Sequence, residues 1–326
     1  MSSLVVHFLN VGHGDCTIVE HPSGRITIID IHNGEEIDDD SENEILSEFG
    51  WSKISLEVAK LLGTSKQQLL EKAGYNIPRT NPIDFLKSEY PQKTVYRYIQ
   101  THPDIDHMSG LKALSSSIGI YNFWDTDNTK SMSSFHPFRA RTDKDDWDEY
   151  QRLRDGNGVN VFQNKRGSVG QYWAKDDHDG PGDAIEILSP TSSLVTDCDG
   201  RKDWNNMSYV LRLKHAGRSV ILGGDAEETA WKNIVAEYDI ALGGVSVLKA
   251  SHHGRHSGFH EPAVEIMKPA LTVLSVGKKP ETDAHQDYTK HSDMVWSTRW
   301  KGNVTIRIDD HGNVTANSQY NQEKAA

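Results

Sequence analysis

The chain has little cysteine, little positive charge and no long apolar run, and each shortage excludes a class of protein. Its two cysteines, Cys16 and Cys198, cannot form a framework of several disulfides, which is typical of a reducing compartment. No stretch approaches the roughly 20 apolar residues of a membrane-spanning helix. The N-terminus lacks the basic region and apolar core of a secretory signal. We therefore expect a cytoplasmic protein without a membrane partner.

Positive charge is scarce overall but not everywhere. The net charge is −12, and residues 35–48 hold eight carboxylates and no lysine or arginine. Phosphate contacts dominate affinity for nucleic acid, so an acidic chain is a poor candidate for wrapping a duplex. Residues 249–301 are locally more basic, with eight Lys or Arg against six Asp or Glu. This stretch is either a rim that holds a few phosphates or ordinary solvated surface.

Apolar patterning predicts an α/β protein in which two sheets lie between helical layers. The expected strands are 4–9, 17–20, 25–31, 95–99, one that begins near 184, 208–213, 218–222, 247–250, 271–276, 304–308 and one near 314. The expected helices are 54–62, 65–73, 83–88, 144–153, 227–237, 261–267 and 292–298. We expect one domain over residues 1–316, with a helical insertion at 35–92, an irregular insertion at 125–182 and a flexible tail at 317–326.

Two segments inside these insertions have alternative interpretations. Residues 54–69 faintly resemble a helix-turn-helix, but the second helix offers only Lys66 and Lys72 to phosphates. A helical cap over a site entrance is the preferred interpretation. The acidic loop at 176–180 has the residues to bind a cation, but solvated turn chemistry is the preferred interpretation.

Residues 101–107, Thr-His-Pro-Asp-Ile-Asp-His, are the most informative stretch. Four metal-binding side chains, His102, Asp104, Asp106 and His107, follow the apolar run 95–99. Side chains alternate in direction along extended backbone, so a loop after a buried strand can aim several of them at one point. Histidines and carboxylates that converge in this way need a cation between them. The stretch therefore predicts a metal site.

Three later strands also end in residues that bind metals. The run at 220–222 leads into Gly-Gly and Asp225, and the run at 247–250 leads into His252 and His253. The run at 271–276 is followed by His285 in the next loop. Four such endings in order indicate one shared site.

These motifs resemble the metallo-β-lactamase fold, whose signature is His-x-His-x-Asp-His followed by Gly-Asp and a late His-Gly. The sequence is most similar to the hydrolase domain of the DNA-uptake protein ComEC and its free-standing relatives. Residues 8–15, Phe-Leu-Asn-Val-Gly-His-Gly-Asp, resemble the family's opening Phe-Leu-Asp-Val-Gly-Gln-Gly-Asp. The stretches 28–30, 184–190 and 205–211 also fit. The likeness runs from about residue 4 to residue 316 and implies a four-layer αββα sandwich.

The resemblance also implies two divalent metal ions, Mn²⁺ or Zn²⁺, that share a hydroxide. The implied ligands are His102 and Asp104 for one ion, Asp106, His107 and His253 for the other, and Asp225 between them. Asp106, His252 and His285 are the implied catalytic residues, with His252 and His285 placed to contact phosphate and His285 also to protonate a leaving group. Asp15, Asp30 and Asn206 are the implied outer partners that orient the ligands.

The chain departs from the family pattern in two places. Asp104 replaces the second histidine of the signature, and an oxygen ligand favours manganese or magnesium over zinc. No histidine stands ahead of Gly-Asp, where the family has its middle ligand. Asp203, Asn205 or Asn206 would have to substitute, or one ion is weakly held. His215 is near in sequence, but we expect it on an exposed hairpin turn.

Three functions follow from this pattern. The leading hypothesis is a phosphodiesterase or nuclease that acts on DNA, RNA or a nucleotide with a metal-bound hydroxide. The second is hydrolysis of a lactone, thioester or lactam, and the third is a degenerate metal centre that serves as a regulatory module. The sequence does not reveal the exact substrate or the oligomeric state.

Overall fold

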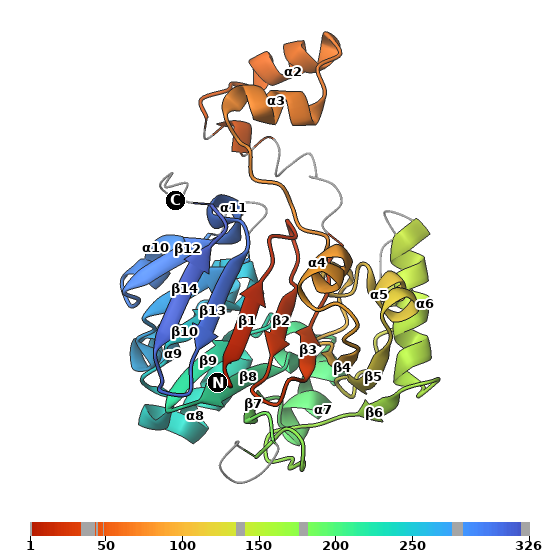
Figure 1. Cartoon of the computed structure of the whole chain (residues 1–326), viewed down its shortest axis with the longest axis vertical. Helices are drawn as coiled ribbons and strands as arrows, with labels where there is room; N and C mark the ends of the chain where they lie inside the picture. The colour runs from red at the N-terminus through yellow and green to blue at the C-terminus, as the bar shows by residue number, and fades with distance from the viewer. Residues whose placement is uncertain are drawn as a thin grey trace.

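The computed structural model describes residues 2–33, 43, 45–47, 49–134, 141–175, 182–275 and 283–320. They form two β-sheets flanked by helices (Figure 1). The first sheet contains, in spatial order, β14 (Val314–Ser318), β13 (Val304–Ile308), β1 (Leu4–Phe8), β2 (Thr17–Glu20), β3 (Ile26–Ile29), β4 (Val95–Ile99), β5 (Ile120–Trp124) and β6 (Asn160–Phe162). The second contains β12 (Met294–Ser297), β11 (Leu271–Leu274), β10 (Val247–Lys249), β9 (Arg218–Leu222), β8 (Val210–His215) and β7 (Ile185–Ser189).

Helices cover the outer faces of both sheets, and two more stand apart from them. The helices of the described residues are α2 (Lys53–Leu61), α3 (Lys66–Ala73), α4 (Pro82–Glu89), α5 (Leu111–Ser117), α6 (Arg141–Arg154), α7 (Ser192–Arg201), α8 (Glu228–Tyr238), α9 (Glu261–Met267), α10 (His285–Thr289) and α11 (Thr298–Lys301). Of these, α4, α5 and α6 lie on the first sheet and α7, α8 and α9 on the second.

Three apolar clusters hold the layers together. One joins α4, α5 and α6 to the outer face of the first sheet through residues such as Leu114 and Phe123. The second fills the space between the sheets, where Phe8 packs in the same cluster as Leu211. The third, around Trp231, joins α7, α8 and α9 to the second sheet. Each fully buried apolar side chain of these clusters contributes about 1.5–3 kcal/mol to the stability of the fold. The order of the layers, helices, sheet, sheet and helices, confirms the predicted four-layer sandwich.

Parallel pairing explains how distant segments reach one edge of the sandwich. Strands β3, β4 and β5 run parallel, as do β9, β10, β11 and β12. The carboxyl ends of parallel strands meet at the same edge of a sheet, where ligand sites commonly lie. The loops that follow β3, β4, β9 and β10 carry the sequence motifs.

The helices α2 and α3 stand apart from the sheets (Figure 1). Ser52 caps the first and Ser65 forms a capping box with Gln68 at the second, so each helix begins where its sequence predicts. Their inner faces pack in a small separate cluster that includes Leu56 and Trp300. The role of this pair as a cap over the site stays a prediction.

Two predicted boundaries are wrong. Residues 292–298 were expected to be helical, but 294–297 form β12 at the edge of the second sheet, because Met-Val-Trp-Ser is a short β-prone run that pairs with β11. The expected tail at 317–326 begins inside β14, since Asn317 and Ser318 pair with β13. The insertion at 125–182 contains α6 and also supplies β6 to the first sheet.

Some predictions fall on residues outside the described ranges. These are most of the acidic run at 35–48, the loop at 176–180, Val276 and Gly277 after β11, and residues 321–326. Among the described residues, no helix combines the length and the apolar character that crossing a membrane requires.

Candidate metal centre

Four histidine rings and one aspartate meet where three loops come together at the edge of the sandwich. His102 and His107 follow β4, Asp225 follows β9, and His252 and His253 follow β10. All of them are buried except His252, which is partly exposed. The question for each ring is which nitrogen carries the hydrogen and what the other nitrogen faces.

Asp30, just after β3, fixes the orientation of His107. His107 Nδ1 donates to Asp30 Oδ2 at 2.7 Å, which leaves Nε2 directed at Asp225, with 3.2 Å to Oδ1. His107 Nε2 is buried and has no hydrogen-bond partner among the described residues. A carboxylate on the far nitrogen is the usual way in which proteins orient a histidine that binds a metal.

Thr101 links the same aspartate to His102. Its hydroxyl donates to Asp30 Oδ2 at 2.6 Å, so the hydroxyl oxygen accepts from His102 Nδ1 at 3.0 Å. His102 Nε2 is then a buried acceptor, 3.8 Å from Asp225 Oδ2. Asp30 therefore sets the direction of both histidines of the first motif.

Asp15 and Lys249 play the corresponding part for His253. Asp15 Oδ1 lies 3.5 Å from His253 Nδ1, while Asp15 Oδ2 accepts from the buried ammonium of Lys249 at 2.6 Å. His253 Nε2 lies 3.6 Å from Asp225 Oδ2. The lysine neutralises Asp15 and holds it in place behind the ring.

Glu227 orients the ring of His252. Its Oε1 accepts from His252 Nδ1 at 2.9 Å, and His252 Nε2 lies 3.7 Å from Asp225 Oδ2. The ring is therefore oriented like the other three, although it is less buried.

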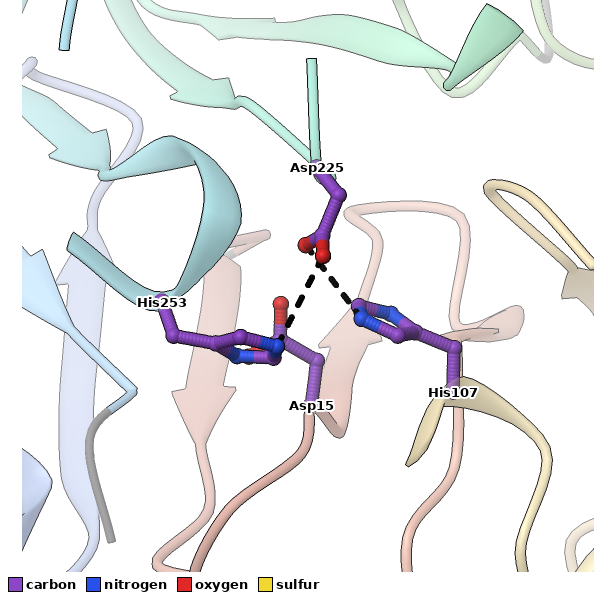
Figure 2. A group of neighbouring side chains, drawn as sticks. All are labelled: Asp15, His107, Asp225 and His253. Atoms are coloured by element: carbon purple, nitrogen blue, oxygen red, sulfur yellow. Dashed lines mark ion pairs between the residues drawn. The ribbon is translucent and has the colours of Figure 1, made fainter. Parts of the chain in front are cut away.

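The four Nε2 atoms surround one carboxylate, and Figure 2 shows how His107, His253 and Asp15 converge on Asp225 from separate segments. The Nε2–oxygen distances range from 3.2 to 3.8 Å. With hydrogen on each Nδ1, the Nε2 atoms of His102, His107 and His253 present lone pairs to a carboxylate, which is repulsive unless a cation or a proton lies between them, whereas His252 Nε2 already accepts from Arg255. The residues fit a divalent metal ion, and this buried cluster of histidines and aspartates suggests such a site.

The backbone at the cluster is strained in a way that serves the site. His252 and His253 both have left-handed φ angles, 48° and 56°, and Asp30 has a φ of 57°. Such conformations cost about 1–3 kcal/mol each and persist where the surroundings enforce them. Gly258 supports the turn, because a Cβ there would lie 2.4 Å from the carbonyl oxygen of Ser251.

Charge separates these histidines from the other buried histidines. Burial by itself disfavours a charged His253, but the carboxylates of Asp225 and Asp15 outweigh it and raise the pKa to about 9. The pKa of His107 is raised well above its usual value because Asp225 and Asp30 outweigh its burial. Burial instead lowers the pKa of His7 and of His21 to about 4. Burial also lowers the pKa of His102 within the cluster, so His107 and His253 are the two rings there that their carboxylates favour in the charged form.

Asp106 and His13 form a second group around His253. Asp106 Oδ2 is 3.4 Å from His253 Nε2 and 3.9 Å from His13 Nε2. Within the described residues, two sets of three or more donors lie within 4.8 Å of one another: Asp15, His107, Asp225 and His253, and His13, Asp106 and His253. Sequence reasoning missed His13, although a histidine between two glycines beside Asp15 was a signal.

Asp104 lies differently from the other predicted ligands. Its Oδ2 is 3.9 Å from His102 Nε2, but its Oδ1 forms an ion pair with the buried Lys130. The Lys130 ammonium also lies 4.6 Å from the centre of the Trp204 ring. His102 and Asp104 belong to neither compact donor set. Nothing in the local sequence pointed to Lys130.

The proposed substitutes for the middle histidine have other partners. Asn206 Nδ2 donates to both oxygens of Asp203 at 3.0 Å, and Asn206 Oδ1 accepts from the Ala230 N–H at 3.0 Å. Asn205 hydrogen bonds to Glu227. His215 is buried rather than exposed, which corrects that expectation, and it lies at the end of the β8–β9 hairpin away from Asp225.

His285 is the first residue of α10, beside the loop that carries His253. Its N–H donates to Asp283 Oδ1 at 2.9 Å, and the adjacent Ala284 N–H donates to the carbonyl oxygen of Gly254 at 2.9 Å. The backbone of its segment thus neighbours the cluster. Its catalytic role stays a prediction.

Comparisons with known proteins reach the fold and no further. No family model matches the chain, and no curated protein matches it. YhfI of Bacillus subtilis, described as a metallo-β-lactamase fold protein, is 9% identical over 96% of this chain and 99% of its own, with a TM-score of 0.43. Igni18 of Ignicoccus hospitalis, described as a metallo hydrolase, is 13% identical over 96% and 98%, with a TM-score of 0.47.

CmlA of Streptomyces venezuelae, described as a diiron β-hydroxylase, is 10% identical over 93% of this chain and 54% of its own, with a TM-score of 0.45. At such identities and TM-scores the likeness concerns the type of fold alone. The metal centre rests on the residues of this chain, and its closer resemblance to ComEC-type proteins stays a prediction.

Proposed function

We propose that this chain is a metal-dependent hydrolase that cleaves a phosphodiester in DNA, RNA or a nucleotide. The observation that carries the proposal is the set of four oriented Nε2 atoms around Asp225. A bound divalent metal would lower the pKa of a water molecule toward neutrality and stabilise an oxyanion. His107, His253 and Asp225 would hold the metal, and Asp15 and Asp30 would keep the two rings in position.

Cations at the edge of the cluster support a substrate with phosphate. Lys130 lies beside Asp104, and the Arg255 guanidinium contacts both His252 and His13. A neutral lactone offers no anionic group for such cations to bind, whereas a phosphodiester carries its negative charge at the bond that is cleaved. The motif resemblance to ComEC-type hydrolases agrees with this choice of substrate.

The test is hydrolysis of bis-p-nitrophenyl phosphate and of single-stranded DNA with Mn²⁺. We expect turnover by the wild type and loss of it in Asp106→Ala and His107→Ala. A matched control is His311→Ala, which changes a histidine with a largely exposed side chain in a surface turn. Cleavage that persists unchanged in both site variants would overturn the proposal. Turnover of nitrocefin or an acyl-homoserine lactone without phosphodiester cleavage would favour the second class of hydrolase.

A further inference from the structure

Arg255 lies two residues after His253, and its side chain contacts two histidines, His252 and His13. One terminal nitrogen donates to His252 Nε2 at 3.1 Å, and the other donates to His13 Nε2 at 3.0 Å. The Nε atom of the guanidinium is buried without a hydrogen-bond partner in the described part of the chain. Arg255 is therefore held by two neutral acceptors, which use two of its five N–H donors.

The charge of this guanidinium is not balanced by a neighbouring carboxylate. No described Asp or Glu forms an ion pair within 4.0 Å of Arg255, whereas Arg97, Arg154 and Arg212 each have one. A partly buried cation beside neutral imidazoles is costly unless an anion completes the site. The absent partner of Arg255 is therefore expected to be negatively charged.

The position of Arg255 indicates what that anion contacts. The two histidines that it joins lie next to the two carboxylates of the cluster, with His252 Nε2 3.7 Å from Asp225 and His13 Nε2 3.9 Å from Asp106. A guanidinium and a metal ion so close together repel one another unless an anion lies between them. An oxyanion bound to the metal would meet both requirements.

We propose that Arg255, positioned by His13 and His252, binds the phosphoryl oxygens of the substrate. The inference rests on the proposed function and deepens it, because it assigns the substrate class to a tetrahedral oxyanion rather than to a neutral carbonyl. With one N–H of each terminal nitrogen held by a histidine, Nε–H and the second N–H of each terminal nitrogen stay fixed in one plane, a geometry that suits two oxygens of a phosphate better than the rotating ammonium of lysine does. Arg255 stands where sequence reasoning looked only to His252 and His285 for phosphate contacts.

The experiment measures binding of inorganic phosphate to the whole metal-loaded protein by calorimetry, together with its metal content. The variants are Arg255→Gln, which removes the charge, and Arg255→Lys, which keeps it. Arg307→Gln is the matched control, because Arg307 is exposed on β13 and pairs with Val5 at the start of β1, far along the strand from residues 13–15.

We expect Arg255→Gln to weaken phosphate binding about ten- to a hundredfold, the effect of losing one charge-assisted contact. The phosphate affinity of Arg255→Lys should lie between that of Arg255→Gln and that of the wild type, and Arg307→Gln should have the affinity of the wild type. These comparisons are made at equal metal content. With bis-p-nitrophenyl phosphate, the KM of Arg255→Gln should rise more than its kcat falls.

Two results would overturn the inference: a wild type that binds metal but no phosphate, or an Arg255→Gln variant that retains both metal and wild-type phosphate affinity. If the second occurs while phosphodiesters are still cleaved, the proposed function stands and this inference fails. If phosphate binding depends on Arg255 but the protein cleaves no phosphodiester, the inference about Arg255 stands and the proposed function fails.

Discussion

The two flanks of Asp225 are built differently. On the His253 flank, the ring is backed by Asp15 and Lys249 and faces Asp106, and the donors lie within 4.8 Å of one another. On the His102 flank, the ring is oriented by Thr101, but the nearest carboxylate, Asp104, is partly exposed and paired with Lys130. The His253 flank presents metal-binding atoms to a cation, whereas the His102 flank already contains a cation, the ammonium of Lys130.

The difference shows that the two metal positions implied by the sequence motif are not equivalent. Each flank contributes a buried Nε2 to Asp225, so both are oriented toward the same point. On the His253 flank, Asp15 is offset by Lys249, but Asp106 pairs with no lysine or arginine of the described residues; on the other flank, Lys130 offsets the charge of Asp104. We therefore expect a divalent ion to bind more tightly beside His253 than beside His102.

The largest expected effect comes from Asp225→Asn, because Asp225 faces all four rings. Losing its charge leaves the histidines without a shared anionic partner, and we expect metal affinity to fall by more than about a hundredfold, beyond the range for outer partners. Metal analysis after dialysis measures this. Retention of a full equivalent would show that the flanks hold metal without a shared carboxylate.

The next effect is the pH dependence of metal binding on the His253 flank. The metal-free His253 ring has a pKa of about 9, and the pKa of His107 is also raised; both rings must lose a proton to bind a metal, so affinity should rise at least about tenfold per pH unit between pH 7 and pH 9. Proton release, measured by calorimetry in buffers of different ionisation enthalpy, checks the sign. An affinity that is flat over this range would contradict a charged His253.

The same raised pKa makes a prediction for the metal-free fold. Protonated His253 stabilises the folded state fully below the unfolded pKa of about 6.5, and this contribution is lost as the pH rises through about 9. Its size is on the order of 3 kcal/mol. Chemical denaturation of metal-free protein at pH 6.5 and pH 9 measures the difference.

Asp30→Asn should have a smaller effect that reaches both flanks. The amide cannot accept from His107 Nδ1 and Thr101 as the carboxylate does, so we expect a loss of about ten- to a hundredfold in metal affinity. Asp310→Asn, on a surface turn, is the control. If only binding at one flank weakens, the link from Asp30 through Thr101 to His102 is unimportant.

The smallest effect is expected from Lys130→Met, which frees Asp104. We expect affinity for a second metal ion to rise by less than about tenfold, since one partly exposed charge contact is removed. Lys144→Met, in an exposed ion pair on α6, serves as the matched control. Weaker metal binding in Lys130→Met would reverse the proposed difference between the flanks.

The sequence predicted the fold through short, strongly apolar runs such as Val95–Ile99, whose bounds agree with β4. The segments of the site were predictable because each follows such a strand and holds several donors. Lys130, Glu227 and Arg255 were not, because each reaches the cluster through long-range folding rather than through a local pattern. The edge strand at 294–297 was missed because a four-residue run shows no clear period.

The most direct test of the metal centre is anomalous diffraction at the Mn and Zn edges from crystals of the whole protein soaked in each metal. We predict a peak about 2.0–2.3 Å from His107 Nε2, His253 Nε2 and an Asp225 oxygen, with a weaker one, if any, beside His102. Saturating metal that yields no peak among these residues, or peaks only on the acidic surface, would contradict a metal centre at Asp225.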